Sequence, residues 1–197
     1  MKCPEDRSTS HWAAEMSDQR RRFEVQALPH LDAAYNLARW LARPPLDADD
    51  IVQDAMLRAF RGFETFRGDN MKPWLLSIVR NCHLTAVGQT RHTLNVPLPS
   101  DAELDLEDHA LIVDDPDPEA SVIQTQLGRR LNGLIDRLPA EFREVLVLRE
   151  MEDMSYRDIA QVTGAPIGTV MSRLARARAL LKQTWVAAGQ ELPHAVQ

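Results

Sequence analysis

The residues best suited to chemistry in this chain are polar and basic side chains spaced along a predicted helix near its C-terminus. They are Thr169, Ser172, Arg173, Arg176 and Lys182. An apolar stripe at steps of three and four predicts the buried side of the same helix, and it consists of Ile167, Val170, Leu174, Ala177 and Leu181. Between Gly164 and Trp185 there are four basic residues and no acidic one. Polar side chains that face base edges, with cations that meet phosphates, are what a DNA-reading helix presents.

The segment before this helix completes a helix-turn-helix pattern. A short helical run with apolar Ile159 and Val162 reaches Gly164, which tolerates a left-handed turn, and Pro166 fixes the chain before the second helix. The alternative is a helical hairpin whose basic face is merely solvated, because this motif also occurs in proteins that do not bind DNA.

No catalytic or metal-binding constellation is predicted. Cys82 and His83 are sequence neighbours that point about 100° apart on a helix, so they cannot easily form a nucleophile–base pair. Cys3 and His11 add no metal-site spacing, and no phosphate-binding glycine loop is present. We therefore expect no enzyme activity, no catalytic residue, no metal and no cofactor.

Composition favours a soluble, all-α protein with a charged linker. The 197-residue chain has eight glycines and a net charge of −6. Residues 93–122 hold nine acidic residues, four prolines and no Lys or Arg, so the remainder carries +3. We interpret this segment as a flexible linker, with DNA mimicry as a less favoured role. The absence of a long apolar run, of a signal peptide and of a disulfide framework predicts a cytoplasmic protein without membrane insertion.

The first half, residues 23–92, is predicted to form a separate helical domain. One helix near Leu28–Ala42 has its expected core side chains at Leu31, Ala34, Tyr35, Ala38 and Leu41. A second begins at Asp47, a plausible N-cap, and its apolar stripe leaves Asp50, Gln53, Asp54, Arg58 and Arg61 on the other face. A third begins near Pro73, and its Trp74 is interpreted as a core anchor.

Two blocks of the sequence carry a family resemblance. DADDIVQDAMLRAFRGFETFRGDNMKPWLLSIVRN resembles the second conserved region of bacterial extracytoplasmic-function (ECF) sigma factors, and LPAEFREVLVLREMEDMSYRDIAQVTGAPIGTVMSRLARARALL resembles their fourth. The resemblance implies a region 2 domain at 23–92, a linker at 93–122 and a region 4 helix-turn-helix domain at 123–186. Residues 1–22 are then an N-terminal extension, and 187–197 a C-terminal tail.

The resemblance also implies partners and site residues. Core RNA polymerase would bind through its β′ clamp helices, contacting Asp50, Gln53 and Asp54, and through its β flap. The promoter minus-ten element would be contacted by Gly68, Asp69, Asn70, Lys72, Arg80, Asn81 and Arg91. The minus-thirty-five element would be contacted by Thr169, Ser172, Arg173, Arg176 and Lys182. An anti-sigma factor would control the protein in response to stress, and initiation would proceed without catalysis by this chain.

Three positions depart from the family pattern, and two alternatives stay open. Thr85 and Gly88 stand where acidic and basic residues are common, and Met171 stands where a basic residue is common. The main alternative is a sigma-like decoy that sequesters an anti-sigma protein without binding DNA. The other is an ordinary helix-turn-helix repressor, which would normally carry a sensor domain.

Overall fold

The protein is helical throughout the residues that its structure describes. The structure is a computed structural model that describes residues 8–42, 46–94 and 121–187, without the side chains of 8–17, 90–94 and 121–127. These residues form helices and turns and contain no strand, which confirms the predicted all-α fold. They include no helix long and apolar enough to cross a membrane. Most of the predicted linker, residues 95–120, lies outside the described residues.

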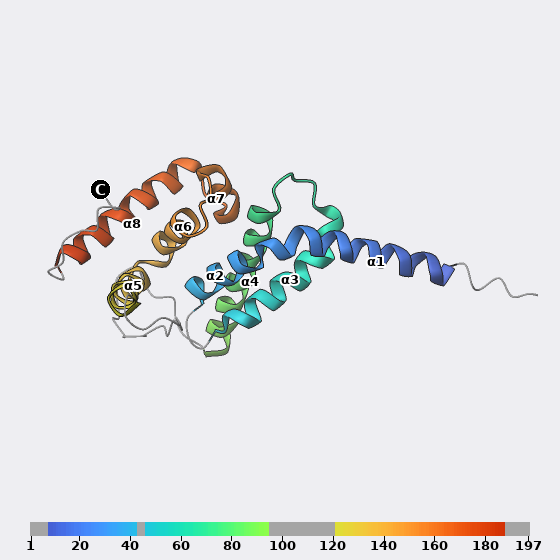
Figure 1. Cartoon of the computed structure of the whole chain (residues 1–197), viewed down its shortest axis with the longest axis horizontal. Helices are drawn as coiled ribbons and strands as arrows, with labels where there is room; N and C mark the ends of the chain where they lie inside the picture. The colour runs from blue at the N-terminus through green and yellow to red at the C-terminus, as the bar shows by residue number, and fades with distance from the viewer. Residues whose placement is uncertain (1–7, 43–45, 95–120, 188–197) are drawn as a thin grey trace, which may run out of the picture. The chain divides into compact units, whose positions relative to one another are not determined.

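The chain divides into two compact units, and α1 to α4 lie in the first (Figure 1). In order, the elements of this unit are α1 (Ser8–Ala27), η1 (Leu28–His30), α2 (Leu31–Leu41), α3 (Ala48–Gly62), η2 (Phe63–Thr65) and α4 (Met71–Leu94). Helix α1 occupies most of the segment expected to be a simple extension. Its end is anchored by Phe23, whose buried ring meets Phe60 and Phe63 edge to face with centroids 5.4 Å apart in each pair.

Helix α2 packs against α3 through a face that differs in part from the predicted one. Leu31 and Tyr35 were expected in the core but are exposed, whereas Leu37 is fully buried beside Ala34 and Ala38. Both sets of positions have helical spacing, so periodicity alone could not separate them. The small alanines let the backbones approach closely, and the larger Leu31 and Tyr35 lie outside that contact.

The starts of α3 and α4 are each fixed by a polar side chain. The Asp49 N–H donates to Asp47 Oδ1 at 2.9 Å, which confirms Asp47 as the N-cap of α3. The Lys72 N–H donates to Asn70 Oδ1 at 3.3 Å at the start of α4. Helix α4 therefore begins two residues before Pro73, which its first turn accommodates. The buried residues of these two helices include Ile51, Val52, Ala55, Ala59, Leu75, Leu76 and Val79.

The second unit contains α5 (Ser121–Asp136), α6 (Ala140–Glu150), most of α7 (Tyr156–Thr163) and α8 (Ile167–Ala187). Gly164 has φ +67°, so the predicted left-handed turn between α7 and α8 is confirmed. Helix α8 packs along α6 and also contacts α5. Its buried side chains are Val170, Leu174, Ala177 and Trp185.

Candidate polymerase and nucleic-acid interfaces

The outer face of α3 holds the three residues predicted to bind polymerase. Asp50 and Gln53 are exposed, while Asp54 is half-buried. Arg58 pairs with both oxygens of Asp54, with its Nη2 2.8 Å from Oδ2 and its Nε 3.1 Å from Oδ1. The hydrogen bond to Asp54 raises the pKa of the Arg58 guanidinium. Asp50 and Gln53 are thus directed to solvent, and Asp54 is already engaged within the helix.

The loop between η2 and α4 presents the first predicted minus-ten residues. Gly68, Asp69 and Asn70 are all exposed. Phe66 packs on Trp74 with ring centroids 4.9 Å apart, and a Cβ on Gly68 would lie only 3.0 Å from the Phe66 ring. Trp74, interpreted from the sequence as a core anchor, is half-buried and packs against the loop through Phe66.

Arg67 ties this loop to the preceding turn. Its Nη1 donates to the backbone carbonyls of Glu64 and Phe66. A pocket of about 330 Å³ opens beside it. Its lining residues are Arg22, Gln26, Phe63, Glu64, Phe66, Arg67 and Gly68.

The sequence analysis did not single out Arg22 or Gln26 of α1. Arg22 fell in the segment interpreted as an extension, and Gln26 lay before the first expected helix. The run RRRF was the available signal, because Phe23 could have anchored a helix that carries arginines toward the loop.

The remaining minus-ten candidates follow along α4. Lys72 and Arg80 are half-buried, and Asn81 is exposed. The side chain of Arg91 lies outside the described part of the chain. Cys82, which follows Asn81 on α4, is buried. Its burial is the main cause that raises the pKa of its thiol to about 11, and the charge of Asp54 is the second cause.

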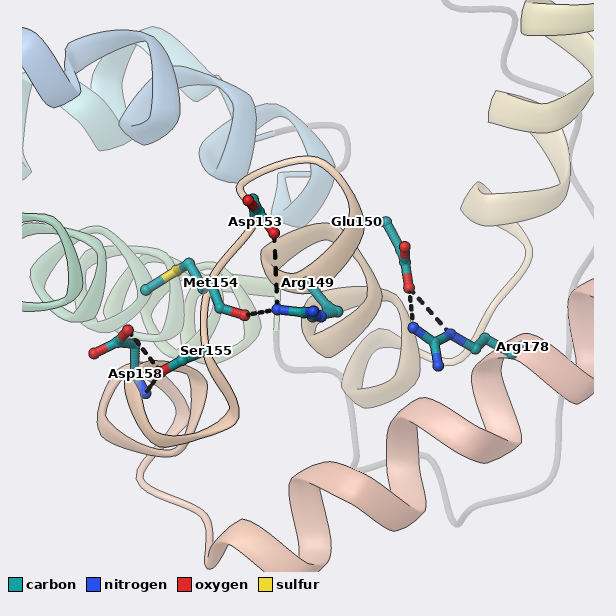
Figure 2. A network of polar contacts seen from close by, with 7 residues as sticks. All are labelled: Arg149, Glu150, Asp153, Met154, Ser155, Asp158 and Arg178. Carbon is teal, nitrogen blue, oxygen red and sulfur yellow. Dashed lines mark hydrogen bonds and ion pairs between the residues drawn. The ribbon is translucent and has the colours of Figure 1, made fainter. Parts of the chain in front are cut away.

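The turn that leads into the helix-turn-helix is held by backbone and side-chain bonds (Figure 2). Ser155 caps the start of α7: the Asp158 N–H donates to Ser155 Oγ at 3.1 Å, and the Ser155 hydroxyl donates to Asp158 Oδ2 at 2.7 Å. Arg149 donates to the carbonyl of Met154 at 2.7 Å and lies over the Tyr156 ring. These contacts hold the turn from which α7 begins.

The polar residues of α8 do not share one environment. Ser172, Arg176 and Lys182 are exposed, and Thr169 is half-buried. Ser172 Oγ donates to the Thr169 carbonyl at 2.9 Å, a bond within the helix.

Arg173 differs from these residues, because its Nη2 lies 2.6 Å from Glu141 Oε2 and its side chain is only 26% exposed. The sequence analysis missed Glu141. Its partner is distant in sequence, so no local pattern indicated it.

A second ion pair also joins α6 to α8. Arg178 contacts Glu150 through Nε at 3.0 Å and through Nη2, as Figure 2 shows. Both nitrogens donate to the same oxygen, Glu150 Oε1, and this hydrogen bonding is the main cause that raises the pKa of the Arg178 guanidinium. Two salt bridges thus join α6 to α8, beside the contact that the buried side chains of α8 make.

Comparison with known proteins identifies the two units. Residues 28–93 match the family model described as Sigma-70 region 2, and residues 128–181 match Sigma-70, region 4. The ECF RNA polymerase sigma-E factor of Haemophilus influenzae is 36% identical over 151 residues, which cover 74% of this chain and 77% of that protein. The chain belongs to the ECF family of RNA polymerase sigma factors.

Two further relatives agree with this assignment. ECF RNA polymerase sigma factor SigE of Mycolicibacterium smegmatis is 33% identical over 153 residues, which cover 78% of this chain and 57% of that longer relative. The structure of the sigma factor RpoE of Bartonella quintana in complex with the anti-sigma factor NepR superposes with a TM-score of 0.67 at 26% identity, covering 83% of this chain and 96% of that one. This ECF sigma factor therefore shares its helical units with a sigma factor whose structure contains an anti-sigma partner.

Proposed function

We propose that this ECF sigma factor binds core RNA polymerase through α3 and reads promoter DNA through the loop before α4 and through α8. In this proposal, residues 23–92 act at the clamp helices and the minus-ten element, and residues 123–186 act at the β flap and the minus-thirty-five element. The acidic segment 93–122 connects them. The observation that carries the proposal is that one chain holds both an exposed polar face on α3 and an exposed basic face on α8.

The polymerase contact is supported by the division of α3 into two faces. Ile51, Ala55 and Ala59 are buried, so the fold does not need Asp50 or Gln53 for its core. A carboxylate and an amide on that outer face suit basic and amide partners on another protein. Asp54 contributes less directly, because Arg58 already occupies both its oxygens.

The test is the double change Asp50→Ala with Gln53→Ala in the full chain. We expect core polymerase binding to weaken by tenfold or more while the circular dichroism spectrum is unchanged, because both side chains are exposed. Asp32→Ala removes an exposed carboxylate from α2 and serves as the matched control. Equal affinity of both variants for core enzyme would contradict the docking assignment.

The minus-ten contact is supported by the pocket at the loop of Arg67 and Gly68. Opening of DNA requires an unpaired base to be held out of the stack, and an aromatic ring with flanking cations suits that task. Phe66 offers the ring and Arg22 and Arg67 offer the cations, so α1 joins the predicted loop residues in this proposal. Asn70 contributes by capping α4. Farther along that helix, the backbone of the single DNA strand would be contacted by Lys72, Arg80, Asn81 and Arg91.

The upstream contact is supported by the outward residues of α8. Arg176 and Lys182 suit phosphate oxygens, while Thr169 and Ser172 lie near the helix start, where base edges are read. Arg173 keeps donors beyond the one that meets Glu141, since a guanidinium has five N–H groups. We infer that Glu141 orients Arg173 for a base contact.

Regulation by an anti-sigma factor is the last part of the proposal. It is supported by the family and by the Bartonella quintana structure, which contains NepR. An anti-sigma factor that covered α3 would block the polymerase contact directly. The decoy alternative gains no support from these matches. A cytoplasmic location follows from the proposed work on bacterial promoters.

A further inference from the structure

Two apolar side chains lie exposed at the start of α8, and one of them, Ile167, was expected to be buried. Ile167 is 47% exposed and Met171 is 51% exposed. Ile167 was expected in the core, and Met171 was set aside as a departure from a basic position. The two are four residues apart, so they lie next to each other on one flank of the helix. The buried side chains of α8 are other residues, so core packing does not explain why these two positions are apolar.

The surroundings of the pair fit DNA better than an apolar protein groove. A recognition helix presents the residues of its first turns to base edges in the major groove. Lys182 is exposed eleven residues after Met171, which is about three turns, so it lies on the same flank. Helix α8 contains no acidic residue. This flank therefore combines two apolar tips near the helix start with a cation farther along.

We propose that Ile167 and Met171 contact the C5-methyl groups of thymines in the upstream promoter element. Thymine presents an apolar methyl group in the major groove, and aliphatic side chains are its usual partners. The inference rests on the proposed placement of α8 in DNA and adds a base preference to it. A basic residue is common at the position of Met171 in the family. Met171 would therefore favour A·T pairs in place of the contact that a cation makes with DNA.

The test removes single methyl groups from the DNA. Holoenzyme made from the full chain and core polymerase first selects a duplex from a library randomised across the upstream element. Each thymine in the selected duplex is then replaced by deoxyuridine, which lacks only the methyl group. At one or two positions we expect binding to weaken about fourfold, the factor that corresponds to burying one methyl group.

The side-chain partners are identified by combining both changes. Met171→Ala should weaken binding to the thymine duplex by a similar factor, and deoxyuridine at the Met171 position should then cause no further loss. Ile167→Ala should behave alike at its own position. Alanine preserves the helix, and both side chains are exposed, so folding is retained. Val186→Ala is the control, since Val186 is an exposed apolar residue at the end of α8 and its removal should leave the thymine preference intact.

Two results would overturn the inference alone. One is that replacing thymine by deoxyuridine does not weaken binding, or weakens it equally in the wild type and in both variants. The other is a selected element without thymine. Arg176→Ala tests the underlying placement, because loss of a phosphate contact should weaken binding to all duplexes alike. If Arg176→Ala leaves binding unchanged, both the placement of α8 and the thymine contacts fail.

Discussion

Arg173 and Glu141 are the residues whose roles change most between sequence and structure. The sequence placed Arg173 among outward polar residues, yet its guanidinium meets a carboxylate from the first turn of α6 at 2.6 Å. That carboxylate lies at a helix N-terminus, where negative charge is favourable. The pair holds a flexible side chain in one orientation, which is what a base-reading arginine needs and a phosphate-binding one does not.

A single change separates these uses of Arg173. Glu141→Gln should raise the affinity of holoenzyme for scrambled upstream duplexes, because a negative charge near the phosphates is removed. It should lower the ratio of matched to scrambled affinity, because Arg173 is no longer oriented. Ion pairs near the surface contribute only about 0–1 kcal/mol, and the Glu141 side chain is half exposed, so stability should change little. An unchanged affinity ratio across salt concentrations would show that Glu141 does not orient a base contact.

Cys82 gives a prediction that depends on pH. Burial, with Asp54 as the second cause, raises the pKa of its thiol to about 11 in the folded protein. The folded state therefore holds this proton more tightly than the unfolded state does. The resulting stability is complete below the unfolded pKa and is lost as the pH rises through about 11.

The measurement for Cys82 compares urea unfolding of the wild type and Cys82→Ala at several pH values. The difference in unfolding free energy should be constant near pH 7–8 and should shrink toward pH 11. Groups that titrate in both proteins cancel in this difference. A gap that stays constant or widens in alkali would contradict the assigned direction of the pKa.

Among the elements, the helices that carry the site could be predicted because their signals are local. Asp47 as an N-cap and Gly164 as a left-handed turn are local signals that do not depend on tertiary packing. The buried face of α2 could not be fixed, since Leu31/Tyr35 and Leu37 fit the same helical period and only α3 selects between them. Helix α1 was missed because its polar sequence lacks a clear apolar stripe. The Arg173–Glu141 pair depends on tertiary structure alone.

The cap at the start of α7, where Ser155 is followed three residues later by Asp158, was not predicted from the sequence. Ser155→Ala removes the acceptor for the Asp158 N–H and should destabilise the protein by about 1 kcal/mol. Ser172→Ala is the matched control, because its hydroxyl bonds only to the preceding turn of α8 and alanine is a good helix former. Thermal unfolding of both variants decides the point. Equal stability of the two would show that the cap does not fix α7.

At the scale of the whole molecule, function depends on two small helical units connected by a strongly acidic segment. Each unit has its own core, as the buried residues of α3 with α4 and of α6 with α8 show. The net charge of −6 hides a basic balance outside residues 93–122. The acidic residues are concentrated in residues 93–122, so the chain can be acidic overall and still present a basic face on α8.

Run-off transcription in vitro shows whether this chain directs core RNA polymerase to promoters. Purified core enzyme is incubated with a promoter library, with and without the full chain. We expect discrete transcripts that require the chain, that are lost with the Asp50→Ala and Gln53→Ala double variant, and that persist with Asp32→Ala. A chain that folds and binds core enzyme but yields no promoter-dependent transcript would contradict the proposed function.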